Sequence, residues 1–265
     1  MTPQKLLSHA DDATLWPGPG AGQAVSDMNT AYRAALAVRA LRIARGERPV
    51  GYKVGFTNRG IWSRYNVAAP IWGTMWDTTV AYCDGNAEVS LVRCCQPRLE
   101  PEVVFGLRAT PPPAPTLDDV FDCVDWMAPG FEVVQSHLPD WKFTAPDTVA
   151  DGGLHARLLI GPRAEVRAHA ASAQALEAQL TAAVVALCRD GVEVERGSGG
   201  NVLDGPLHAL NQFVTELQQC DGAPSLVAGD VITTGTWTDA WPVQSGQGWT
   251  ACFTAPLRPL AVRFG

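Results

Sequence analysis

Hydrophobic and polar side chains alternate along residues 96–107, QPRLEPEVVFGL. Successive side chains of a strand point to opposite faces, so this alternation predicts a half-buried strand. One face carries four apolar residues, Leu99, Pro101, Val103 and Phe105. Glu100 and Glu102 fall on the other face, about 7 Å apart along the backbone. Because Pro101 has no N–H to donate, we expect the strand to lie at a sheet edge or to contain a bulge.

The same kind of pattern predicts the other elements of the chain. Helices are expected over residues 24–46, with Ser26 as N-cap, over 117–127, which Thr116 caps and Pro129-Gly130 ends, and over 205–219. Strands are expected over residues 49–57, 78–92 (two strands joined around Asp84-Gly85), 98–107, 131–136, 155–161, 181–197, 226–237, 248–254 and 259–264. Asp190-Gly191 predicts a two-residue hairpin turn within 181–197.

Strands outnumber helices, and the hairpins indicate mostly antiparallel or mixed pairing, which predicts an α+β fold. No domain linker follows the first predicted helix. We therefore expect a small N-terminal helical lobe over residues 1–50 and a β-rich catalytic domain over residues 51–265.

Composition narrows the class of protein. Hydrophobic residues make up 46% of the 265 residues, so a large core is available, and no apolar run is long enough to span a membrane. The first 20 residues do not resemble a secretory signal. Seven cysteines without metal-ligand spacing indicate reduced thiols, and hence a cytoplasmic protein. A net charge of −7 without a basic block argues against nucleic acid as a partner.

Glu132 adds a third carboxylate, inside the short apolar segment of residues 131–136. An ionised carboxylate in such surroundings is costly unless it is paired or bound to a metal. Three carboxylates from two strands match the oxygen ligands that Mg²⁺ prefers, with positions left for water or a bidentate substrate. The alternative is a set of salt bridges with Arg98 or other arginines.

Several motifs, in the same order along the chain, resemble the fumarylacetoacetate hydrolase superfamily, and within it the 2-oxopent-4-enoate hydratases and 4-oxalocrotonate decarboxylases. The matching segments are GYKVGFT (51–57), PIWGTMWD (70–77), QPRLEPEVVFGL (96–107), PGFEVVQSHLPDWKFTAPDTVADG (129–152), ERGSGGNVLDGPLHALNQF (195–213) and AGDVITTGTWT (228–238). The resemblance implies a rolled, mixed β-sheet fold of the family's C-terminal-domain type. It also implies a divalent ion, Mg²⁺ or Mn²⁺, held by Glu100, Glu102 and Glu132.

The resemblance also implies catalytic and substrate-binding residues. Lys53 matches the lysine of the G-x-K-V-G-x-T motif and becomes an active-site acid or base, with Asp77 as its neighbour. A lysine there moves protons on a 2-oxo acid whose enolate a metal stabilises. Thr234 and Gly235 are expected to contact the substrate carboxylate. Four tryptophans beside the motifs are expected to line an apolar pocket: Trp72, Trp76, Trp237 and Trp241.

One segment departs from the family pattern. The hydratases carry an active-site serine after the segment DTVAD, whereas this chain reads DTVADGGLH, which places Leu154 at the position of the serine. The loss of the hydroxyl puts hydration of the usual small substrate in doubt and favours a bulkier, apolar one. His155 follows at once, but strand alternation points it away from the side of Leu154.

The resemblance implies hydration of a 2-hydroxyalka-2,4-dienoate (a 2-oxo-4-enoate) in the degradation of aromatic compounds, by a protein that forms homo-oligomers. The alternatives are decarboxylation of a 4-oxalocrotonate-like acid, and hydrolysis of an acylpyruvate C–C bond with His137 or His155 as base. A non-catalytic partner subunit is a further alternative, although intact Lys53 and glutamates argue against it.

Overall fold

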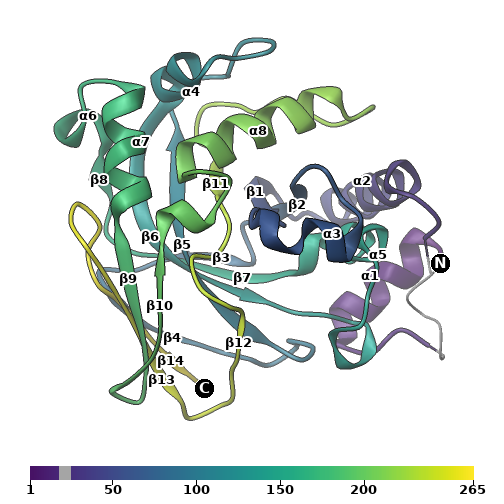
Figure 1. The fold of residues 1–265 in the computed structure, drawn as a ribbon. Coiled ribbons are helices and arrows are strands. Elements are labelled where there is room, and N and C mark those ends of the chain that lie inside the picture. The colour runs from purple at the N-terminus through teal and green to yellow at the C-terminus, as the bar shows by residue number, and fades with distance from the viewer. Residues whose placement is uncertain (18–24) are drawn as a thin grey trace.

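The computed structural model describes residues 1–17 and 25–265, which form two β-sheets with helices along two sides (Figure 1). The larger sheet has nine strands within these residues: β1 (Pro49–Gly55), β2 (Ile71–Trp76), β3 (Val80–Tyr82), β5 (Arg98–Leu107), β6 (Val124–Val134), β7 (His155–Ile160), β8 (Ala164–Glu165), β11 (Val231–Thr233) and β12 (Trp241–Pro242). Seven of them follow the order β2-β1-β11-β5-β6-β7-β3, while β12 pairs with β5 and β8 with β6. The sheet is mixed, because β1 and β11 run parallel whereas β5 and β6 run antiparallel.

The smaller sheet follows the order β10-β9-β13-β14-β4. Its strands are β4 (Asn86–Val89), β9 (Val184–Arg189), β10 (Val192–Ser198), β13 (Gly248–Phe253) and β14 (Leu260–Phe264). Asp190 and Gly191 join β9 and β10 with φ angles of 50° and 82°, as a two-residue turn requires. The predicted hairpin is therefore confirmed. The strands predicted around Asp84-Gly85 are β3 and β4, but each of them pairs with a different sheet.

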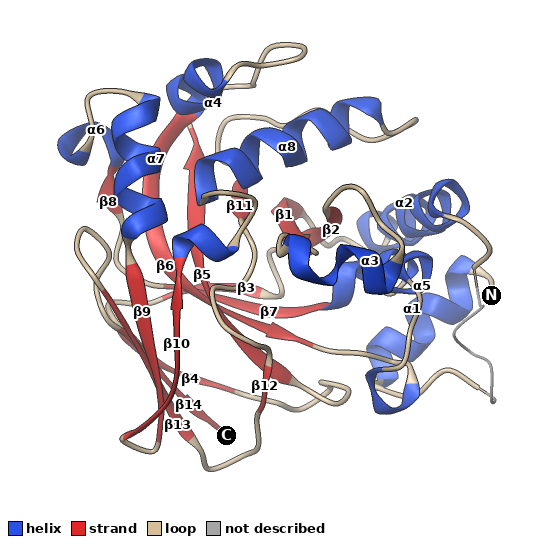
Figure 2. Cartoon of the chain, in the orientation of Figure 1, coloured by secondary structure: helices blue, strands red, loops and turns tan. Residues whose placement is uncertain are grey.

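The helices gather in two groups (Figure 2). The α-helices of the described chain are α1 (Pro3–Asp12), α2 (Met28–Ala44), α3 (Trp62–Tyr65), α4 (Leu117–Cys123), α5 (Ala145–Ala150), α6 (Val166–His169), α7 (Ala173–Ala182) and α8 (Pro206–Gln219). Short 3₁₀ turns cover Arg59–Ile61, Pro139–Trp141, Gly152–Leu154 and Gly199–Asn201. The largest apolar cluster joins both sheets to α4, α7 and α8, whereas α1, α2 and α5 share a second cluster with β2. The predicted α+β, mixed-sheet fold is confirmed.

The N-terminal segment differs from its prediction in detail. Helix α1 was not predicted, and α2 is capped by Asp27, whose carboxylate accepts from the Thr30 N–H at 2.8 Å, rather than by Ser26. Residue 24, where the predicted helix begins, lies outside the described residues. The proposed boundary between residues 50 and 51 falls inside β1, so the two-domain division stays a prediction.

The helix expected over residues 117–127 is too long. Helix α4 begins at the predicted Thr116 cap but ends at Cys123, and Val124 opens the long strand β6. Pairing with β5 outweighs the local helical pattern, so Pro129 and Gly130 lie inside a strand instead of ending a helix.

Strand β5 lies inside the larger sheet, so the edge position expected from Pro101 is wrong, while the bulge named as its alternative is found at Gly106/Leu107, away from the proline. On one side β6 pairs along its length. On the other side β12 pairs with residues 98–99 and β11 with residues 104–106. Pro101, which has no N–H to donate, lies in the gap between these two partner strands. The Pro101 carbonyl accepts from the Trp237 N–H at 3.1 Å. The segment between β11 and β12 is thereby held over the face of β5.

None of the helices in the described chain combines the length and hydropathy that a membrane crossing requires.

Candidate active site

Three glutamates converge on one face of β5 and β6. Glu100 lies directly opposite Glu132 in the strand register, and Glu102 follows two residues later on the same face. One carboxylate oxygen from each lies within 4.8 Å of the others. Glu102 and Glu132 are fully buried, while Glu100 is partly exposed. The alternation of β5 therefore brings the acids together as the sequence predicted, with Leu99, Val103 and Phe105 in the core behind them.

In each of the two buried acids, one carboxylate oxygen accepts a hydrogen bond from the described part of the chain and the other does not. Glu102 Oε2 accepts from the backbone N–H of Gly235 at 2.7 Å, and Glu132 Oε1 lies 2.8 Å from His155 Nδ1. Among the described residues, Glu102 Oε1 and Glu132 Oε2 have no hydrogen-bond partner although both are buried. Buried carboxylate oxygens without partners are costly, and three converging carboxylates are a donor set suited to Mg²⁺ or Mn²⁺. The residues present thus fit a hard divalent cation.

Lys53 lies against this cluster. Its side chain is 3% exposed, and Nζ is 3.6 Å from Glu132 Oε2, which is an ion-pair distance but too long for a hydrogen bond. Close backbone packing holds its stem. A methyl group at Gly73 would lie 2.1 Å from the carbonyl oxygen of Gly152, and one at Gly153 would lie 3.0 Å from Lys53 Cδ. The glycines of the WGT and DGG segments therefore let the 152–154 turn close over Lys53.

Burial and like charge shape the ionisation of the cluster. Burial raises the pKa of Glu100 to about 7, and the charge of Glu132 adds to this effect. Burial also raises the pKa of Glu102 well above its usual value, with the charges of Glu132 and Glu100 adding to it. Burial also acts on Glu132, but Lys53 and His155 outweigh it and lower its pKa. Burial would lower the pKa of Lys53, yet the three carboxylates outweigh it, so this pKa is raised.

A cavity of about 320 Å³ opens over the cluster. Its lining includes Lys53, Glu100, Leu154 and Gly235. Leu154 is 7% exposed and occupies the left-handed backbone region at a φ of 67°. The structure thus places Leu154 in the same cavity as Lys53.

Aromatic residues that the sequence argument did not select form one wall of this cavity. Phe56 stacks on Tyr65 with ring centroids 4.8 Å apart, Tyr65 stacks on Phe143 at 5.6 Å, and Trp141 lies 6.1 Å from Phe143. The guanidinium of Arg98 lies 4.2 Å from the centroid of the Trp141 ring. These residues come from separate segments of the chain, namely the connection from β1 to β2, the start of β5 and the connection from β6 to α5, so their sequence positions gave no common signal. Among the four tryptophans expected to line the pocket, only Trp237 does so.

Two predicted site residues lie elsewhere. Lys53 pairs with Gly73 in the β1–β2 register, so Asp77 lies beyond the far end of β2, where it accepts from the Arg48 N–H and Nε at 3.0 and 2.9 Å. Asp77 is therefore not a neighbour of Lys53. Trp76 packs under the guanidinium of Arg42 at 4.4 Å and lines a different cavity.

The position of Thr234 is only partly as expected. Its hydroxyl donates to the Val103 carbonyl at 3.1 Å and is buried, so it secures the loop after β11 and is not part of the cavity lining. Gly235 does line the cavity, at a φ of 96°, and a methyl group there would lie 1.8 Å from Thr57 Oγ1.

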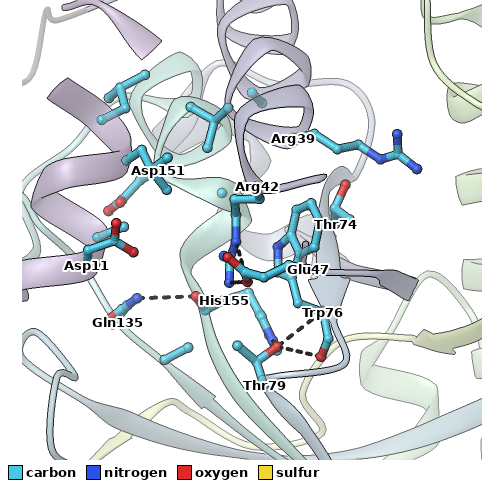
Figure 3. A pocket seen from close by; sticks show the side chains of 18 of the residues that line it. Asp11, Arg39, Arg42, Glu47, Thr74, Trp76, Thr79, Gln135, Asp151 and His155 are labelled. Carbon is cyan, nitrogen blue, oxygen red and sulfur yellow. Dashed lines mark hydrogen bonds and ion pairs between the residues drawn. The ribbon is translucent and has the colours of Figure 1, made fainter. Parts of the chain in front are cut away.

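The second cavity, of about 410 Å³, lies between α1, α2 and the larger sheet (Figure 3). His137 and His155 both line it, and neither lines the cavity that contains Lys53. His137 Nδ1 lies 2.6 Å from Asp151 Oδ1. Neither histidine is therefore placed to activate water beside Leu154, which removes the base that C–C hydrolysis would need.

The chain is an α+β protein that carries a cluster of three carboxylates on one face of a rolled, mixed sheet. Comparison with known proteins gives its family. Residues 70–256 match the family model for the fumarylacetoacetate (FAA) hydrolase C-terminal domain. The chain therefore belongs to the fumarylacetoacetate hydrolase family, as its motifs predicted.

Individual relatives include a hydratase and a decarboxylase. A 2-hydroxyhexa-2,4-dienoate hydratase from Comamonas testosteroni is 34% identical over 82% of this chain and 78% of its own length. A 4-oxalocrotonate decarboxylase from a Pseudomonas species is 27% identical over 91% of this chain and 90% of its own. The solved structure of 4-oxalocrotonate decarboxylase from Pseudomonas putida G7, complexed with magnesium and adipate, matches with a TM-score of 0.87 at 25% identity, covering 100% of this chain and 99% of that one.

Proposed function

We propose that the protein is a divalent-metal-dependent lyase whose Mg²⁺ or Mn²⁺ is held by Glu100, Glu102 and Glu132. The observation that carries the proposal is the pair of buried oxygens that accept no hydrogen bond within the described residues, Glu102 Oε1 and Glu132 Oε2, beside Glu100. When bound, such a cation supplies Lewis-acid stabilisation of the enolate of a 2-oxo acid. The relatives named as acting on 2-hydroxydienoic acids support this substrate class.

The first candidate reaction is hydration of a 2-hydroxyalka-2,4-dienoate. Lys53 is a buried, titratable group that lines the cavity beside the cluster, and its Nζ would carry protons to and from the substrate carbon chain. With Asp77 at the far end of β2, this role falls to Lys53 alone. The aromatic wall of Phe56, Tyr65 and Phe143 suits the flat, apolar part of a dienoate.

Decarboxylation of a 4-oxalocrotonate-like acid is the second candidate, and Leu154 favours it. An apolar side chain stands in the cavity where the hydratases carry a hydroxyl, so this position cannot hydrogen-bond a reacting water. Arg98, whose guanidinium stacks on the Trp141 ring, lies at the cavity and suits a second substrate carboxylate. The high structural similarity to a decarboxylase also supports this candidate.

The test uses purified full-length protein with a 2-hydroxydienoate or with 4-oxalocrotonate, each in the presence of Mg²⁺ or of EDTA. Loss of dienol absorbance without CO₂ release indicates hydration, and released CO₂ indicates decarboxylation. Glu102→Gln is the inactive control, because it removes charge from the cluster at a fully buried position. Equal turnover in EDTA and Mg²⁺ would exclude the proposed metal chemistry.

The setting in which the enzyme works is also part of the proposal. All seven cysteines are free in the structure, which agrees with the predicted cytoplasmic location. Assembly into a homo-oligomer follows from the family resemblance, and light scattering on the purified protein tests it.

A further inference from the structure

His155 connects the glutamate cluster to the second cavity. Its Nδ1 lies 2.8 Å from Glu132 Oε1, and its Nε2 lies 2.9 Å from Thr79 Oγ1. Figure 3 shows the side of His155 that faces Thr79 and Trp76. The backbone is fixed as well, because the Gln135 amide donates to the His155 carbonyl at 3.3 Å. Both ring nitrogens of this buried side chain are therefore engaged.

The hydrogen bond to Glu132 determines that Nδ1 of His155 carries a proton. An ionised carboxylate oxygen can only accept, so Nδ1 must donate to Glu132. Thr79 Oγ1 accepts from the Trp76 N–H at 3.2 Å and donates to the Trp76 carbonyl at 3.1 Å, so the threonine is held in place 2.9 Å from Nε2. Thr79 thus fixes the ring orientation in which Nδ1–H meets Glu132.

The hydrogen bond to Glu132 has a directional consequence. The bond from His155 to Oε1 restricts rotation of the carboxylate, and Oε2, which accepts no hydrogen bond from the chain as described, faces Lys53 Nζ at 3.6 Å. Gly235 plays the corresponding part for Glu102, holding Oε2 and leaving Oε1 over. Both buried acids are therefore oriented from behind by one donor each.

We propose that His155 is a positioning residue, supported by Thr79, that aims Glu132 Oε2 at the cation site. This role rests on the metal site proposed above. Groups that orient metal ligands typically contribute 10- to 100-fold to metal affinity. The role is distinct from that of a base, because His155 does not line the cavity that contains Leu154.

Two substitutions separate orientation from volume. In His155→Asn the amide nitrogen can occupy the place of Nδ1 and keep the donor to Glu132. In His155→Gln it reaches instead toward the place of Nε2, so the bond to Glu132 is lost while that to Thr79 is kept. Thr79→Ser and Thr79→Val form a second matched pair, in which only the valine removes the hydroxyl.

The readouts are the Mn²⁺ dissociation constant from paramagnetic-resonance titration and the midpoint of urea unfolding without metal. We expect His155→Gln to weaken Mn²⁺ binding 10- to 100-fold and His155→Asn to stay within about threefold of wild type. Thr79→Val should weaken binding about three- to tenfold, because the ring loses the polar contact at Nε2 that fixes its orientation, and Thr79→Ser should not.

The outcomes separate this role from the metal site itself. If wild type fails to bind Mn²⁺, the metal site and this role are both wrong. If Glu102→Gln loses Mn²⁺ binding but His155→Gln keeps it, only the role of His155 is refuted. Equal losses in the asparagine and glutamine variants would likewise refute it, because a purely structural histidine does not distinguish them. Should His155→Gln not fold, unchanged affinity in Thr79→Val overturns the proposal.

Discussion

Removing the charge of Lys53 should have opposite effects on metal binding and on catalysis. Lys53→Met keeps most of the buried stem and deletes an ammonium group 3.6 Å from Glu132 Oε2. At an effective dielectric constant of about 20, that pair is worth about 5 kcal/mol of Coulomb energy. Deleting one partner of a buried pair costs about 3–5 kcal/mol. Because the pKa of Glu100 is raised to about 7, protonation of Glu100 relieves part of the repulsion among the three carboxylates. We therefore expect the free energy of unfolding without metal to fall by about 3 kcal/mol.

A divalent cation should reverse that loss. Without the ammonium group, the cation meets the full charge of the three carboxylates, so Mn²⁺ affinity should rise and Mn²⁺ should restore the unfolding midpoint. Turnover should nevertheless fall about 10²- to 10⁴-fold, because Lys53 moves the proton. Urea unfolding with and without Mn²⁺, together with dienol turnover at saturating Mn²⁺, measures both effects.

Lys142→Met is the matched control. Lys142 Nζ lies 3.5 Å from Asp140 Oδ2, almost the distance of the buried pair, but both side chains are more than three-quarters exposed. Exposed pairs are worth about 0–1 kcal/mol, so stability, Mn²⁺ affinity and turnover should all stay near wild type. If Lys53→Met keeps wild-type turnover, or binds Mn²⁺ more weakly than wild type, the reasoning about Lys53 is wrong.

Three further predictions concern the same cavity. Burial raises the pKa of Glu100 to about 7, so the contribution of this group to stability is present below about pH 4.5 and is lost as pH rises toward 7. Mn²⁺ should therefore raise the melting temperature more at pH 8 than at pH 6. An equal rise at both pH values would contradict this. Leu154→Ser should improve kcat/KM for 2-hydroxypentadienoate relative to a bulkier dienoate by about tenfold, and an unchanged ratio would show that this position does not set specificity. Gly235→Ala would place a methyl group 1.8 Å from Thr57 Oγ1 and displace the N–H that holds Glu102, so calorimetry should show a lower melting temperature and Mn²⁺ titration weaker binding; wild-type values for both would refute this account.

The alternation of apolar and polar residues predicted the centre of the site because it depends only on strand geometry. Glu100 and Glu102 had to share a face whichever strand lay beside β5. That Glu132 lies directly opposite Glu100 depends on register, which a single sequence does not display. The family motifs indicated that the three acids belong to one site, but they did not give the register.

Predictions that used proximity along the chain were less reliable. Trp76 and Asp77 belong to the same motif as Gly73, which does pair with Lys53, but a strand rises about 3.3 Å per residue and carries them away from the site. The aromatic wall was missed for the complementary reason. Phe56 and Tyr65 lie between β1 and β2 and Phe143 lies before α5, and no local pattern predicts that these two segments meet.

Leu154 and His155 show how one short segment serves two environments. Leu154 ends the 152–154 turn in the left-handed backbone region and His155 opens β7, so Leu154 lines the proposed substrate cavity while His155 lies behind it, against Glu132 and Thr79. The loss of a hydroxyl in front and the presence of an imidazole behind are therefore independent features of the sequence. Changes at Leu154 should alter which substrate is accepted, whereas changes at His155 should alter how firmly the cation is held. A double variant of Leu154→Ser and His155→Gln should thus combine the two effects additively, and strong coupling between them would indicate that the segment moves as one unit.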